Sequence, residues 1–145
     1  FDSALNYATK NADGWAAVVA VDNAYCCDDS HITLGPGSAP FVAYEARDLG
    51  YTVADGSAMP WTFEPLHDPM VRVGDIAFDG AGGLVYSLLG GESDVILGRP
   101  SGAGWDESVV SSEALNFMMA LDAADGAHFA IRTEEALHYV LDAVE

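Results

Sequence analysis

Basic residues are scarce in this chain. Five lysines and arginines stand against 23 aspartates and glutamates, so the 145 residues carry a formal net charge of −18 at pH 7. Nucleic acid is therefore not an expected partner, because phosphate contacts need clusters of lysine and arginine. The acidity is expected mainly to keep the protein soluble.

Long apolar runs are also missing. The longest runs from Trp15 to Val21, whereas a membrane-spanning helix needs ~20 apolar residues. We therefore expect no membrane insertion. The sequence begins at Phe1 instead of a methionine, as a processed protein would, and it is poor in lysine. These features favour a secreted or cell-surface location.

Catalytic patterns are missing too. The sequence holds no Ser/His/Asp order, no glycine-rich phosphate loop and no pair of histidines at a metal-binding spacing. His128 and His138 are expected to be ordinary strand residues. The chain is therefore expected to be non-enzymatic.

What the chain does have is an internal repeat. Three segments begin 44 and 43 residues apart: Ile32–Tyr44, Ile76–Leu88 and Met119–Ile131. The tryptophans keep nearly the same step: Trp15, Trp61 and Trp105. Apolar pairs follow the same period: Leu5 with Tyr7, Leu49 with Tyr51, and Leu137 with Tyr139. Repeats of 40 to 50 residues built from short strands are typical of β-propeller blades.

The expected fold is all-β, with about three four-stranded propeller blades and incomplete blades at both termini. Hairpin turns are expected at Gly35–Ala39, Asp79–Gly83 and Asp122–Gly126, where glycine and aspartate suit a reversing backbone. Thr133–Glu145 contains helix-favouring residues, but the repeat alignment predicts a strand there. The single domain divides as follows: a partial blade at 1–29, blades at 30–70 and 71–112, and a partial blade at 113–145.

Incomplete blades at both ends predict self-assembly. Unpaired strand edges are templates for pairing with another chain. Copies are therefore expected to join head to tail, into a ring if the rotation closes and into a filament if it does not. We expect this contact to bury Leu5, Tyr7, Leu137 and Tyr139.

The repeat resembles extracellular bacterial β-propeller repeats of the sialidase-like kind. The residues that carry the resemblance are Ala120–Asp122, Gly126, His128–Ala130, Leu137–Tyr139 and Gly104–Trp105. The resemblance implies a blade architecture shared by glycan-binding lectins, sialidases and other surface proteins. The module is expected to act by self-assembly or by binding a surface ligand, and a lectin-like, glycan-binding propeller is the alternative. A glycosidase comes third, because four arginines are few for binding an acidic sugar.

The recurring tryptophans have two interpretations. Trp15, Trp61 and Trp105 could pack between neighbouring blades, as large aromatics commonly do. They could instead stack on sugar rings at several equivalent sites, which would raise affinity through multivalency. We keep all three as candidate ligand-binding residues.

An insertion relative to the repeat carries the two cysteines. Cys26 and Cys27 are adjacent, and could form a vicinal disulfide, remain free or join chains, or bind a metal. Asp22, Asp28 and Asp29 surround them. Carboxylates in a loop suit Ca²⁺, so this loop is either a solvated acidic segment or a calcium site. No cofactor is certain, and Ca²⁺ is the one candidate.

Overall fold

The protein is all-β in the described part of the chain, which confirms the all-β part of the expected fold. A computed structural model describes residues 3–24, 30–46, 50–67, 72–102 and 104–142. One 3₁₀ turn, Pro36–Ser38, interrupts the strands. The strands are β1 (Ser3–Asn11), β2 (Gly14–Ala24), β3 (His31–Leu34), β4 (Pro40–Ala46), β5 (Gly50–Asp55), β6 (Thr62–His67), β7 (Arg72–Phe78), β8 (Leu84–Leu89), β9 (Val95–Ser101), β10 (Gly104–Ser111), β11 (Asn116–Leu121), β12 (Ala127–Arg132) and β13 (Leu137–Asp142).

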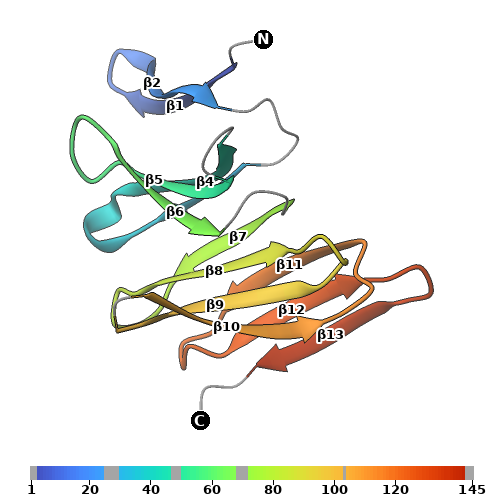
Figure 1. The fold of residues 1–145 in the computed structure, drawn as a ribbon. Coiled ribbons are helices and arrows are strands. Elements are labelled where there is room, and N and C mark those ends of the chain that lie inside the picture. The colour runs from blue at the N-terminus through green and yellow to red at the C-terminus, as the bar shows by residue number, and fades with distance from the viewer. Residues whose placement is uncertain (1–2, 25–29, 47–49, 68–71, 103, 143–145) are drawn as a thin grey trace.

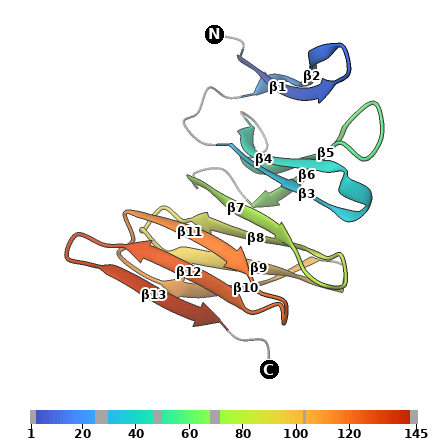
Figure 2. The ribbon, with the colours of Figure 1, turned by 180° about the vertical axis from the view of Figure 1, so that it is seen from behind.

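The strands form antiparallel meanders that follow one another along the chain (Figure 1). Strands β3–β6 form the first meander, β7–β10 the second and β11–β13 the third. The hairpin β1–β2 precedes them and joins the first meander through a single pair, Ala24 with Ala46. The hairpin and β13 lie at opposite ends of the resulting stack in both views (Figures 1 and 2).

Aspartates fix the hairpin turns of the second and third meanders. The Asp79 carboxylate accepts hydrogen bonds from the backbone N–H groups of Ala81 and Gly83, at 3.0 and 2.6 Å. The Asp122 carboxylate repeats this arrangement with Ala124 and Gly126, at 2.7 and 3.0 Å. Aspartate favours such turns because its side chain can bond the backbone two residues on. The predicted turns at these positions are confirmed.

The C-terminal segment is a strand, as the repeat predicts. Strand β13 pairs with β12 over its whole length, from Arg132 with Leu137 to Ala127 with Asp142. Its residues favour a helix intrinsically, but pairing with β12 overrides so weak a preference.

Each junction between successive sheets holds its own apolar core. Leu5 and Tyr7 of β1 pack against a cluster of Val42, Tyr44, Ala46, Ala54 and Trp61. The next junction contains Ala43, Tyr51, Val53, Leu66, Ile76, Tyr86 and Leu88. The last contains Val85, Leu89, Val95, Leu97, Ala114, Ala127, Phe129 and Ile131. Strands β4 and β8 supply alternate residues to the core on either side, because successive side chains point to opposite faces.

Polar contacts also link neighbouring sheets. Asp75 of β7 accepts a hydrogen bond from the backbone N–H of Met119, at 2.7 Å, and its other oxygen lies 2.7 Å from Nδ1 of His31. Asp75 therefore ties the first strands of all three meanders together. His31 of β3 thus contacts β7.

Candidate functional site

The outer face of the last sheet exposes large apolar side chains, whereas the other sheets bury theirs against the sheet that follows. The face of β11–β13 turned away from the molecule's core carries Met118, Leu137, Tyr139 and Leu141, which are 71, 75, 68 and 48% exposed. The opposite face of the same sheet buries Ala127, Phe129 and Ile131. We call the outer surface, with Ala130 at its centre, the tail face.

Strand register shapes the middle of the tail face. Met118, Ala130 and Tyr139 lie opposite one another across β11, β12 and β13. Two long side chains thus flank the methyl group of Ala130.

Two hydrogen bonds through His128 hold the Tyr139 side chain in place on the tail face. His128 Nε2 lies 2.9 Å from Asp122 Oδ2, and His128 Nδ1 lies 2.6 Å from the Tyr139 hydroxyl oxygen. A carboxylate can only accept, so Nε2 carries a proton and, in the neutral ring, Nδ1 accepts the hydroxyl proton of Tyr139. The bond from His128, followed by those from Ala124 and Gly126, lowers the pKa of Asp122.

Trp15 marks the opposite end of the stack. Its side chain is 74% exposed. It lies opposite Lys10 in the β1–β2 hairpin, and therefore on the other face from Tyr7, which packs inward. We call this outward surface of the hairpin, with Trp15 on it, the head face.

The three tryptophans do not form three equivalent open sites. Trp61 is 6% exposed, and its ring lies 5.5 Å from that of Tyr7. Trp105 is half-buried, with its ring 4.8 Å from that of Tyr86. Trp61 and Trp105 thus pack between sheets, and Trp15 is the tryptophan that offers its ring to a ligand or partner.

The four residues expected at an assembly contact are divided between two environments. Leu5 and Tyr7 are half-buried against the cluster that contains Trp61. Leu137 and Tyr139 remain exposed. The first pair already has a partner within the chain, because Trp61 of the next sheet covers it, whereas the second pair has no such cover among the described residues.

The expected cation and disulfide residues fall largely outside the described residues. Cys26, Cys27, Asp28 and Asp29 all lie there, and Asp22 lies in β2, where only its backbone is described. Within the described ranges, no three histidine, cysteine or acidic side chains gather closely enough to hold a metal ion.

Burial raises the pKa of three tyrosines among the described residues, Tyr44, Tyr51 and Tyr86. Tyr86 is fully buried, and its hydroxyl donates to Glu107 and lies 3.5 Å from the carbonyl of Leu66. Burial, followed by the contact with Glu107, raises the pKa of Tyr86. Glu107 is exposed, and its bond with the Tyr86 hydroxyl joins β10 to β8.

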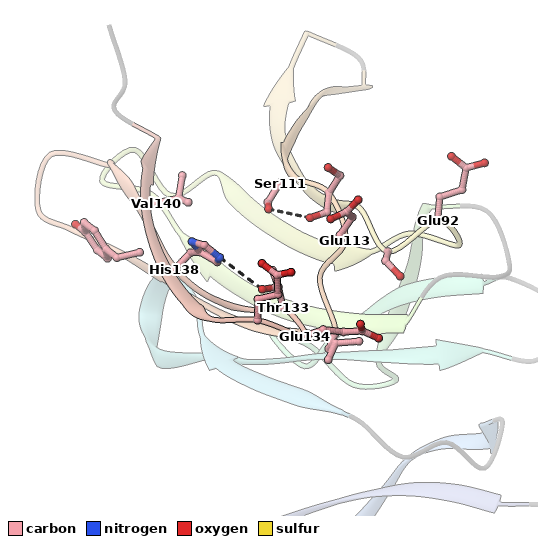
Figure 3. A pocket seen from close by; sticks show the side chains of 12 residues that line it. Glu92, Ser111, Glu113, Thr133, Glu134, His138 and Val140 are labelled. Atoms are coloured by element: carbon pink, nitrogen blue, oxygen red, sulfur yellow. Dashed lines mark hydrogen bonds between the residues drawn. The ribbon is translucent and has the colours of Figure 1, made fainter.

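An open cavity lies beside β13 (Figure 3). It has a volume of about 750 Å³, and its walls come from turns at Glu92–Ser93, Ser111–Glu113 and Thr133–Glu135 together with β13. Four of its lining residues are glutamates, Glu92, Glu113, Glu134 and Glu135. Thr133 Oγ1 lies 3.5 Å from Nε2 of His138. The lining of the cavity is acidic, with His138 beside the four glutamates and no lysine or arginine among the lining residues described.

Comparison with known proteins adds no relative. No family model matches the chain, and no curated protein matches it closely enough to count as similar. In the described part of the chain, no helix has the length and apolar character required to cross a membrane.

Sequence reasoning missed Met118 and Leu141 of the tail face, and the Asp122–His128–Tyr139 chain. The repeat could have located Met118, because it directly precedes Met119, which aligns with Ile32 and Ile76. Nothing in the sequence distinguished a strand face that is covered by the next sheet from one that is not.

Proposed function

We propose that this protein is a secreted or cell-surface module of β-propeller type that acts through self-assembly and not through catalysis. The observation that carries the proposal is the uncovered tail face. Sheets β3–β6 and β7–β10 each bury the corresponding surface against the sheet that follows. The tail face leaves its large apolar side chains open to solvent, with exposed Arg132 opposite Leu137.

Exposure of this kind is unfavourable for an isolated molecule. Burying a large apolar side chain contributes about 1.5–3 kcal/mol relative to leaving it exposed. Contiguous apolar patches on soluble proteins commonly mark interaction sites. A second copy of this chain is the partner we propose, because within the chain Trp61 already packs on Leu5 and Tyr7, the counterparts of Leu137 and Tyr139.

A glycan-binding role remains the alternative, and the open ring of Trp15 favours it. A flat indole can stack on the apolar face of a pyranose ring. With Trp61 buried, such binding would use one aromatic site and not three. Glycan arrays probed with the wild-type chain and with Trp15→Ala test this alternative, which predicts hits that the substitution abolishes.

Molar mass tests the assembly proposal. The 145-residue chain has a mass of 15.2 kDa. We expect light scattering coupled to gel filtration to show multiples of this mass, with the proportion of larger species rising with protein concentration. The salt should be kept near ~0.15 M, where the Debye length of about 8 Å limits repulsion between acidic copies. A mass of 15.2 kDa at every concentration would overturn the proposal.

A further inference from the structure

We infer that the copies join by their faces: the head face of one copy, through Trp15, seats on the tail face of the next. This inference rests on the proposed self-assembly and specifies its contact. It differs from pairing between strand edges, in which backbone N–H and C=O groups of unpaired strands make the contact.

The repeat places equivalent residues on the two surfaces. Leu137 and Tyr139 lie in β13, the third strand of its meander, and they align with Leu5 and Tyr7 in β1. Trp15 in β2 aligns with Trp61, which directly precedes β6. The tail face is therefore the counterpart of the inward face of β1, and the head face is the counterpart of the surface that carries Trp61.

The chain itself shows how these counterparts pack. Trp61 packs against Tyr7 with ring centroids 5.5 Å apart and ring planes at 57°. Leu5 joins the same cluster. Trp15 placed on Leu137 and Tyr139 would repeat this contact between two copies. The intact chain thus provides the template for the contact between copies.

The positions of the two faces require a second molecule. The hairpin and the β11–β13 sheet lie at opposite ends of the stack (Figures 1 and 2). Trp15 therefore cannot reach the tail face of its own chain. The contact is heterologous, with different surfaces on its two sides, and it grows into a ring or a filament according to whether the rotation closes.

Strand exchange is the competing arrangement. In it, β11 and β12 of one copy would lie beside β1 of another copy and complete the sheet that begins with the β1–β2 hairpin. This completed sheet would cover Ile32 and Leu34 of β3, which are 59 and 61% exposed. That arrangement would bury Ile32 and displace β13. Face stacking leaves Ile32 exposed and buries Leu137.

Complementation between two variants tests the inference. Trp15→Ala removes the head contact and Leu137→Asp places a charge in the tail contact. Each variant alone should be a folded monomer, as judged by circular dichroism and light scattering. An equimolar mixture should form a heterodimer of twice the chain mass that grows no further, because each variant keeps one intact face.

Matched controls separate the possible outcomes. Ile32→Asp and Val109→Asp place the same charge at other exposed apolar positions, and both should assemble as the wild type does. If the wild type is monomeric, the proposed self-assembly fails. If the wild type assembles and Leu137→Asp does too, or if Ile32→Asp blocks assembly, self-assembly stands and face stacking is overturned. Two monomeric variants that fail to form a heterodimer would overturn it as well.

Discussion

The three tryptophans of this protein occupy three different environments. Trp61 is buried between the hairpin and the first meander, Trp105 is half-buried at the next junction, and Trp15 lies open to solvent. The spacing predicts their equivalence along the chain. It does not reveal that the sheet needed to cover Trp15 is absent from the described residues.

Substitution by alanine should distinguish the buried and the exposed tryptophan. In dilute solution, where copies are separate, Trp61→Ala should lower the free energy of unfolding by about 3–5 kcal/mol, as large-to-small core changes do. Trp15→Ala should change it by no more than about 0.5 kcal/mol, as exposed substitutions do. Urea unfolding of both variants measures this. Equal losses would show that Trp15 is buried within its own chain.

A close contact between backbone and ring makes Gly98 irreplaceable. A Cβ atom at Gly98 would lie 2.2 Å from the Cζ atom of Tyr86, whereas one at Gly104 would meet nothing within 4 Å. Gly98→Ala should therefore lower stability by about 1–3 kcal/mol, the usual cost of overpacking, and Gly104→Ala should leave it nearly unchanged. Thermal unfolding of the two variants measures the difference, and a tolerated Gly98→Ala would contradict the packing of Tyr86.

The lowered pKa of Asp122 predicts a loss of stability in acid. Its folded-state pKa lies below the usual value of 3.8, so its contribution is complete above that value and disappears as pH falls through the folded pKa. Asp122→Asn should therefore have a lower melting temperature than the wild type near pH 6. The gap should close as the pH falls below ~3. A gap that stays constant from pH 6 to pH 2.5 would show that the carboxylate charge is not responsible.

At the scale of elements, the hairpin β1–β2 is the least anchored part of the fold. It meets the first meander through one strand pair, Ala24 with Ala46, and through the packing of Leu5 and Tyr7. Strand β8, in contrast, pairs with β7 and β9 and is buried on both faces. Local opening requires less free energy where buried contacts are few.

Hydrogen exchange should reveal this difference. Backbone amides of β1 and β2 should exchange faster than those of β8 at protein concentrations where the chain is monomeric. Mass spectrometry of peptides from the two regions measures the exchange. Equal protection would mean that the hairpin opens only when the whole molecule unfolds.

The sequence predicted the positions of the strands better than it predicted which strand faces are covered by a neighbouring sheet. Periodic apolar segments and Asp–Gly turns located the strands of the second and third meanders, because local chemistry decides where a chain extends and reverses. The same repeat also predicted the strand that the structure shows at Leu137–Asp142. It could not show that Leu5 and Tyr7 are covered while Leu137 and Tyr139 are open, since that depends on which sheets are neighbours in space.

At the scale of the whole molecule, both ends of the stack of sheets expose large apolar side chains. The internal junctions bury apolar side chains between consecutive sheets, whereas the ends leave Trp15 exposed on the hairpin, opposite Lys10, and Met118, Leu137, Tyr139 and Leu141 exposed on β11–β13. The net charge of −18 opposes close approach of copies, so the contact must come from apolar burial and not from attraction between charges.

Oxidative footprinting of the wild-type chain across protein concentrations tests this account most directly. Hydroxyl radicals modify exposed Trp15 and Tyr139, whereas Trp61 is shielded throughout and exposed Met59 serves as the reference. The account predicts that Trp15 and Tyr139 become protected together as the molar mass rises, while Met59 stays reactive. Assembly to larger species with Trp15 and Tyr139 still fully reactive would contradict it.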